Sequence, residues 1–225
     1  MTEGLYFHSI VIFDVETTGL DSRLDTIIEF GGIRVTGKAG KTQAVDETDL
    51  LIQLPEGQRL NTQITRLTGI TSAMLTHNGV APHFAADTIS SMISSPDTLL
   101  VAYNAQFDLC FLYHFLKQYG YEECLRGVKM LDALTVYKDR RPYPHKLHDA
   151  IANYRVRGQN THRALDDAKA TWELLCAMQR EYDDLDKYIN LFGYNPRYGI
   201  SGPRISSVTY RAQEYNSSRK LYDLA

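Results

Sequence analysis

Apolar residues in the first part of the chain are arranged as short runs typical of β-strands. The run Ile10–Phe13 fits a strand that is buried on both faces. Residues 26–35 and roughly 44–54 have the pattern of two further strands, and residues 37–40 supply a Gly-rich turn between them. Three consecutive strands with short connections predict an antiparallel meander.

Helical spacing follows the meander. Residues 61–71 and 81–95 have helix-like patterns, and a phenylalanine at every fourth position from Phe107 to Phe115 predicts a helix that ends near Gly120. The longest predicted helix begins at about residue 161 or 163 and ends at residue 182. Its expected buried face consists of Leu165, Ala168, Trp172 and Leu175.

Two more apolar runs, residues 98–103 and 128–131, are of strand length. Residues 137–148 are rich in Pro, Arg and Lys, and we expect an exposed loop there. The order of elements predicts a mixed α/β sheet covered by helices. From residue 190 the periodicity is lost, so we divide the chain into a main domain, residues 1–189, and an extension, residues 190–225.

The composition excludes several classes of protein. The 225 residues are 44% hydrophobic, which is enough for a sizeable core. No stretch reaches the roughly 18 uninterrupted apolar residues of a membrane span, and the start of the chain lacks the pattern of a secretory signal. Three cysteines without CxxC spacing argue against a disulfide framework or a zinc site. We therefore expect a cytoplasmic protein with reduced thiols and no membrane partner.

The distribution of charge also separates residues 1–189 from residues 190–225. The net charge is −3, but the extension carries five Lys or Arg against two acids, a net of +3, which leaves −6 for residues 1–189. The extension is also rich in tyrosine, whose ring can stack on nucleic acid bases. We expect it either to help hold a substrate or partner, or to pack back onto the main domain.

Candidate chemistry begins where the first strand ends. Asp14 and Glu16 are two residues apart, so on a strand their side chains point the same way. Paired acids at the end of a buried strand are costly unless a cation neutralises them, and oxygen ligands suit Mg²⁺ or Mn²⁺. Taken alone, such a pair is also common on solvated loops.

Two further clusters are ambiguous when each is taken by itself. Asp108 follows Asn104 at helical spacing, yet Asn104 could be a helix N-cap and Asp108 an ordinary first-turn acid. Asp167 lies five residues after His162, and on a helix that spacing separates side chains by about 140°. The two can share a site only if His162 precedes the helix, and the N-cap types at residues 160–161 place the helix start there.

Together the three clusters resemble the DEDDh, or DnaQ-like, family of 3′→5′ exonucleases, which includes the proofreading subunit of bacterial DNA polymerase III. The resemblance covers about residues 8–180. The matching segments, in the family's order, are Asp14–Leu20, Asn104–Asp108 and His162–Asp167, with Leu67–Thr71 between the first two. One departure is Tyr103, where the family commonly has histidine; it bears on packing or nucleotide contact. Histidine at position 162 places the chain in the h-type branch.

The resemblance implies a ribonuclease H-like fold, a mixed five-stranded sheet flanked by helices, and two divalent cations, Mg²⁺ or Mn²⁺. The implied metal ligands are Asp14, Glu16, Asp108 and Asp167. His162 is the implied general base, since histidine titrates near neutrality. The implied contacts to the terminal nucleotide are Thr17, Thr18 and Gly19.

The reaction that the resemblance implies is release of nucleoside 5′-monophosphates from the 3′ ends of single-stranded DNA, in proofreading or repair, with a DNA polymerase as a candidate partner. An exoribonuclease similar to RNase T or oligoribonuclease is the alternative, because both use the same metal chemistry. A catalytically silent nucleic-acid-binding or polymerase-tethering module is a third reading. Such modules usually lack one or more ligands, whereas all five site residues are present here.

Overall fold

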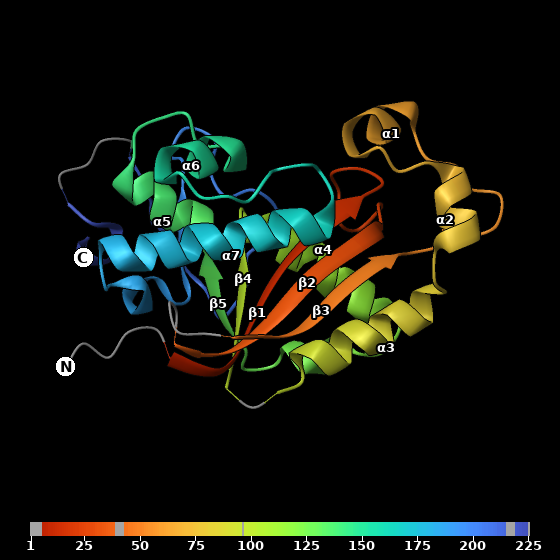
Figure 1. The fold of residues 1–225 in the computed structure, drawn as a ribbon, viewed down its shortest axis with the longest axis horizontal. Helices are drawn as coiled ribbons and strands as arrows, with labels where there is room; N and C mark the ends of the chain where they lie inside the picture. The colour runs from red at the N-terminus through yellow and green to blue at the C-terminus, as the bar shows by residue number, and fades with distance from the viewer. Residues whose placement is uncertain (1–5, 39–42, 96, 215–218, 225) are drawn as a thin grey trace.

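A five-stranded mixed sheet forms the centre of the computed structural model, which describes residues 6–38, 43–95, 97–214 and 219–224 (Figure 1). Its strands are β1 (Tyr6–Thr17), β2 (Ile27–Lys38), β3 (Gln43–Leu51), β4 (Thr98–Ala102) and β5 (Lys129–Asp132). They lie in the order β3-β2-β1-β4-β5, with β1, β2 and β3 antiparallel and β4 and β5 parallel to β1. The predicted meander and mixed sheet are confirmed, although residues 39 and 40 of the predicted turn lie outside the described residues.

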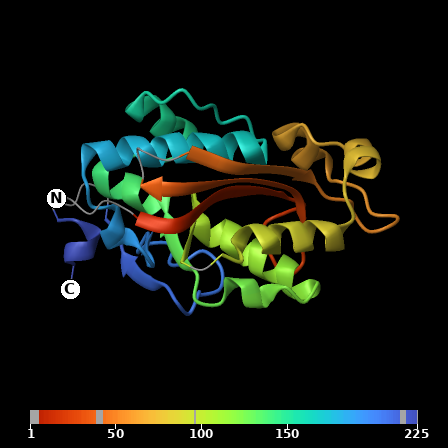
Figure 2. The same cartoon turned by 60° about the horizontal axis from the view of Figure 1, so that its bottom comes forward.

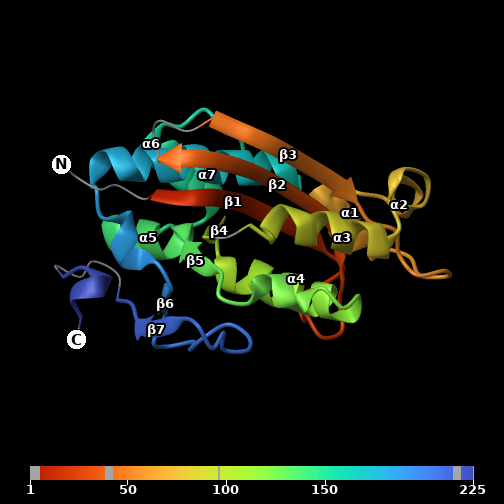
Figure 3. The same ribbon diagram turned by 90° about the horizontal axis from the view of Figure 1, so that it is seen from below.

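Helices cover both faces of this sheet (Figures 2 and 3). One face packs against α3 (Pro82–Ile93) and α4 (Ala105–Gln118), and the other against α7 (Ala164–Glu181). The remaining helices are α1 (Thr62–Thr68), α2 (Ser72–Asn78), α5 (Ala133–Arg140) and α6 (Leu147–Tyr154), with short 3₁₀ turns at Glu122–Leu125, Leu185–Tyr188 and Leu221–Asp223. Strand β1 divides its apolar side chains between the two layers: Val11 and Phe13 join one core, Ile10 and Ile12 the other.

The start of α7 lies directly on β2. A Cβ atom added to Gly31 would stand 2.0 Å from the backbone nitrogen of Leu165, so only glycine permits this approach. Ala164 and Ala168 keep the facing side of α7 small and are fully buried. This contact fixes the first turn of α7 beside the end of β1, where Asp14 and Glu16 lie.

Two parts of the predicted organisation are wrong. The segment 137–148 is not an exposed loop: its first four residues belong to α5, and Tyr137 is fully buried. The cap of that helix, Asp132, lies outside the polar segment, and its carboxylate accepts the backbone N–H groups of Leu134 and Thr135. The stretch predicted as one helix over 61–71 ends at Gly69, which adopts φ 74°, and a separate helix, α2, follows.

The extension packs onto the main domain through a small second sheet. Strands β6 (Leu191–Tyr194) and β7 (Thr209–Ala212) pair in parallel, and Leu191 and Phe192 are buried in the two cores. The backbone of Met130 in β5 exchanges two hydrogen bonds with Asn190, at 2.7 and 2.8 Å. The division of the chain at residue 190 stays a prediction. Among the described residues, no helix is both long and apolar enough to cross a lipid bilayer.

Candidate active site

Four carboxylates from three separate segments meet at one end of the sheet. Asp14 and Glu16 lie at the end of β1, while Asp108 and Asp167 lie in the first turns of α4 and α7. Burial raises the pKa of Asp14 well above its ordinary value, and the charges of Asp108, Asp167 and Glu16 raise it further. A ligand oxygen of Glu16, one of Asp167 and a ring nitrogen of His162 all lie within 4.8 Å of one another.

The other three acids share this environment. Burial, followed by the charges of Glu29 and Asp167, raises the pKa of Glu16 to about 8. Burial also raises the pKa of Asp108 to about 8, although backbone hydrogen bonds from Asp108 and Val15 oppose the shift. For Asp167, burial again dominates and raises the pKa to about 6. The fold therefore gathers acids and leaves much of their mutual repulsion uncompensated.

This donor set fits a divalent cation. All four acids offer only oxygen, and two of them, Asp108 and Asp167, are at most 4% exposed. The guanidinium of Arg163 lowers the pKa of Glu16 only in part, because it is bonded to Glu29. Buried carboxylates without a paired cation are costly, and a metal ion removes that cost.

His162 lies where the five-residue spacing requires it. It is exposed, adopts φ 56° and precedes α7, whose N-cap residue is Arg163. The prediction that residues 160–161 cap the helix is wrong. Instead, the Asn160 amide donates to one oxygen of Asp167, and the backbone N–H of Thr161 donates to the other at 2.9 Å. These bonds tie the loop that holds His162 to the acid beside it.

Glu29 is a buried acid beside the cluster that the motifs did not reveal. It lies opposite Glu16 in the β1–β2 register and is fully buried. Its carboxylate accepts the backbone N–H of Ala164 at 2.9 Å and pairs with the Arg163 guanidinium at 2.6 Å, and so caps α7 from a neighbouring strand. An acid inside the apolar run Ile27–Phe30 was the available signal, since such an acid must have a partner.

Asp132 caps the N-terminus of α4 from a neighbouring strand, as Glu29 caps α7. Asn104 adopts φ 69° and its side chain makes no cap hydrogen bond. The carboxylate of Asp132 accepts the backbone N–H groups of Asn104 and Ala105, at 3.0 and 3.1 Å. Asn104 is thus the N-cap residue of α4 and Asp108 an acid of its first turn, as the alternative reading expects, but the side chain that accepts the N-terminal N–H groups is Asp132 of β5. The helix turn that holds Asp108 is fixed by this contact.

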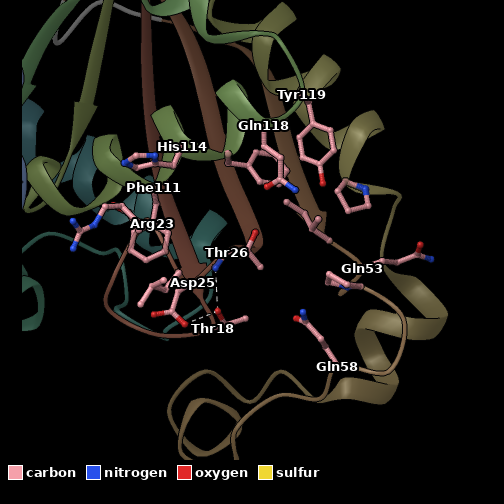
Figure 4. Close-up of a pocket in the computed structure, with 16 residues that line it drawn as sticks. Thr18, Arg23, Asp25, Thr26, Gln53, Gln58, Phe111, His114, Gln118 and Tyr119 are labelled. Carbon is pink, nitrogen blue, oxygen red and sulfur yellow. Dashed lines mark hydrogen bonds between the residues drawn. The ribbon is translucent and has the colours of Figure 1, made fainter.

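The loop after β1 uses its hydroxyl groups internally. Thr17 donates to the carbonyl of Gly19 at 2.6 Å. Thr18 donates to Asp25 and accepts the backbone N–H of Thr26, both at 3.0 Å (Figure 4). A cavity of about 300 Å³ adjoins Thr18, with the aromatic face of α4 opposite it. The Thr17 and Thr18 side chains thus hold the loop in shape.

Tyr103 has a structural role at the end of β4. Its hydroxyl donates to the backbone carbonyl of His145 at 2.8 Å. The ring Nε2–H of His145 donates in turn to the carbonyl of Arg141, 2.9 Å away. The residue that departs from the family pattern therefore fastens the segment between α5 and α6 to the sheet, close to the helix turn of Asp108.

The family profile described as Exonuclease, RNase_T, matches residues 11–175 of this chain. That match covers most of the chain and includes all three acidic motifs. The chain therefore belongs to this exonuclease family, and the predicted family and enzyme class are confirmed.

Among the relatives, the most informative are long bacterial polymerases. A DNA polymerase III PolC-type protein of Bacillus cereus is 33% identical over 223 residues, which is 95% of this chain and 14% of that protein. Its counterpart in Oceanobacillus iheyensis is 31% identical over 229 residues, or 98% of this chain and 15% of that protein. The chain thus spans about 15% of the length of these curated relatives.

Solved structures agree on the fold. E. coli exonuclease I in complex with single-stranded DNA superimposes with a TM-score of 0.72 at 19% identity, over 81% of this chain and 42% of that one. Exonuclease I from Methylocaldum szegediense gives 0.69 at 22% identity, over 79% of this chain and 41% of that one. The predicted mixed five-stranded fold of the ribonuclease H-like class is confirmed.

Proposed function

We propose that this domain hydrolyses single-stranded DNA from its 3′ end and releases nucleoside 5′-monophosphates. The observation that carries the proposal is the cluster of Asp14, Glu16, Asp108 and Asp167, whose pKa values are raised, beside His162. Acids held together in this way bind divalent cations, and bound cations promote the hydrolysis of phosphate diesters, so the cluster suits phosphoryl transfer. The names of the polymerase relatives and of the exonuclease I–DNA complex support the choice of DNA.

The four carboxylates would hold two divalent cations, Mg²⁺ or Mn²⁺, in keeping with an oxygen-only donor set. When bound, the cations would neutralise charge on the scissile phosphate and make water a stronger nucleophile. His162, exposed beside Glu16 and Asp167, would accept the proton of the attacking water. Backbone groups of residues 17–19 would position the terminal nucleotide.

A polymerase context is the natural extension of this proposal. Relatives that match nearly the whole chain are named as polymerases of which this domain spans about 15%. We propose that the domain serves a DNA polymerase, either as part of one chain or by association, in the cytoplasm. An exoribonuclease remains the alternative, because the same site would cleave RNA.

Parallel digestion tests the proposal. Single strands of DNA and RNA with one sequence, labelled at the 5′ end, are incubated with Mg²⁺ or Mn²⁺, and a 3′-labelled set fixes the direction. We expect a descending ladder on 5′-labelled DNA, immediate release of labelled mononucleotide from the 3′ end, and slower digestion of RNA. Faster digestion of RNA would favour the alternative, and digestion of neither would indicate a silent module. Asp14→Ala is the control against contaminating nucleases.

A further inference from the structure

The loop between β6 and β7 reaches from the second sheet to the helix that holds Asp108. Figure 3 shows β6 and β7 beside β5, with their connection extending beneath the first part of α4. The small sheet is fastened there by the backbone N–H of Gly193, which donates to the Thr135 hydroxyl at 3.0 Å, and by the Gln213 amide, which donates to the carbonyl of Thr135 at 2.9 Å. Both contacts lie at the start of α5, next to the carboxyl ends of β4 and β5.

Gln106 binds this loop to the active-site helix. Its side chain is 7% exposed, and its amide nitrogen donates to the carbonyl of Pro203. Its amide oxygen accepts the hydroxyl of Tyr210 at 2.5 Å, and the same hydroxyl accepts the backbone N–H of Ile205 at 3.0 Å. Because Gln106 stands two residues before Asp108, the loop is bound to the same helical turn that holds Asp108, although the two side chains point to different sides of the helix.

Two hollows flank the loop at this point. One, of about 250 Å³, lies between residues 201–203 and the loop after β1, residues 20–23, with Phe107 in its lining. The other, of about 150 Å³, lies between residues 199–201 and the start of α4, and Lys138 lines it. Gln106 lines both hollows. The extension therefore lines two hollows at the start of α4, the helix whose first turn holds Asp108.

The chemistry of the loop contrasts with the acidic site. Residues 190–213 contain three arginines and no acid. At the tip of a tight turn, Tyr198 is 76% exposed and the guanidinium of Arg197 lies 5.5 Å from the centre of its ring. Arg204 is also exposed and lies 5.2 Å from the ring of Tyr210. Both arginines are exposed to solvent, so they do not neutralise the acid cluster and are available to a ligand.

We propose that the β6–β7 loop is a binding surface for single-stranded nucleic acid, which holds the strand upstream of the 3′ end that enters the site. Arg197, Arg204 and Lys138 supply positive charge for phosphates, and Tyr198 offers a ring face for a base. This inference rests on the proposed function for the position of the 3′ end. It assigns the loop a role in strand affinity and none in the chemical step.

The test compares Arg197→Ala/Tyr198→Ala with a matched control, Tyr113→Ala/Lys117→Ala, an exposed cation and tyrosine ring in the second half of α4. Binding of a fluorescein-labelled single strand of about 20 nucleotides is measured by anisotropy in EDTA, which prevents hydrolysis. We expect at least about tenfold weaker binding for the loop variant, a salt slope shallower by about 0.7, and no change for the control. Unchanged affinity in the loop variant, or no binding by the wild type, would overturn the inference.

A second readout separates strand binding from chemistry. Hydrolysis of the 5′-p-nitrophenyl ester of thymidine monophosphate reports on the site without an upstream strand. The loop variant should keep wild-type turnover of this ester, while KM for the long strand rises about tenfold or more. Equal losses on both substrates would show that the loop merely supports the site, and would also overturn the inference. If the wild type binds the strand but hydrolyses neither substrate, the proposed function fails while the binding surface stands.

Discussion

The two ends of helix α7 place buried carboxylates in opposite electrostatic settings. At the C-terminal end, the guanidinium of Arg140 is fully buried and bonds both Asp184 and the carbonyl of Met178, the latter at 2.6 Å. A second acid, Glu181, lies 3.6 Å from the same guanidinium. Charge is thus paired within the protein, as a stabilising contact requires.

At the N-terminal end, Asp167 meets Asp14, Glu16 and Asp108, and like charges face one another. The pKa values of Glu16 and Asp108 rise to about 8, with burial as the largest cause, so these acids resist ionisation near neutral pH. The fold can evidently supply a buried arginine where structure needs one. In this cluster, Arg163 lowers the pKa of Glu16 only in part because it pairs with Glu29, so the acids lack the dedicated arginine that Asp184 has.

Two neighbouring glutamates show the same difference between a paired and an unpaired acid. Glu16 and Glu29 are partners in the β1–β2 register. Glu29 is neutralised by Arg163 and fixes the start of α7, whereas Glu16 remains available for a cation. Glu16 and Glu29 are paired in the sheet, so their different roles come from their partners: Arg163 at the start of α7 binds Glu29 and does not bind Glu16. Predictions that separate paired acids from unpaired ones therefore test this account.

The largest effect is expected at the unpaired acids. Asp14→Ala or Asp167→Ala should lower the rate of single-strand hydrolysis by at least about a thousandfold, or about 4 kcal/mol, because each removes a ligand oxygen. The metal-free domain should be as stable as the wild type or more so, since repulsion is relieved. Hydrolysis rates and thermal unfolding in EDTA measure the two effects. Near-wild-type turnover in purified Asp14→Ala protein would rule out the site.

At the C-terminal end of α7, removal of a paired acid should lower stability and leave the hydrolysis rate unchanged. Asp184→Ala leaves the buried Arg140 guanidinium without its closest acid, and we expect a loss of about 3 kcal/mol in the free energy of unfolding. Turnover at a temperature where the domain stays folded should remain near the wild-type value. Urea unfolding and single-strand hydrolysis, measured side by side, distinguish the variants. A large loss of turnover with intact stability would mean that the two ends do not differ as we describe.

His162 should contribute to rate and not to metal affinity. His162→Ala removes the proposed proton acceptor, and we expect a loss of about a hundredfold in rate. Binding of Mn²⁺, followed by calorimetry, should change little, because the four carboxylates remain. A fall in Mn²⁺ affinity as large as that of Asp167→Ala would identify His162 as a metal ligand instead.

The smallest effect is expected at Glu29, which acts through α7. Glu29→Gln keeps an oxygen for the Ala164 N–H but loses the charge that pairs with Arg163, so we expect about 1–2 kcal/mol of destabilisation. A slight displacement of His162 and Asp167 should lower kcat about tenfold with little change in KM. The control is Glu47→Gln, which removes an exposed ion pair between β3 and Lys169 of α7. It should change neither stability nor kcat appreciably. Equal behaviour of the two variants would contradict the positioning role.

Sequence patterns were sufficient for the sheet and the acid motifs because both depend on local signals. Strand β1 is an apolar run, and Asp14 and Glu16 share a face through the two-residue period of a strand. The position of His162 followed from the rotation per residue of a helix. Family resemblance then supplied the grouping of segments that lie far apart in the chain.

The supporting contacts could not be predicted, because their partners come from other elements. Arg140 looks like a solvated residue until Asp184, more than forty positions later, pairs with it. Asp132 caps α4 from β5, and nothing in the local sequence around Gln106 indicates that its side chain binds Pro203 and Tyr210. The strands of the extension could not be predicted from its composition, because β6 and β7 have only four residues each and depend on contacts with the main domain.

The most direct test of the central claim, that the acid cluster is built for cations, is calorimetric titration of the metal-free domain with Mn²⁺ in buffers of different ionisation enthalpy. At pH 7, Glu16 and Asp108, with pKa values near 8, are largely protonated, and binding must displace protons. We predict release of at least about one proton at pH 7, less release at pH 9, and no comparable binding by Asp14→Ala. Binding without proton release at pH 7, or equal binding by Asp14→Ala, would contradict the account.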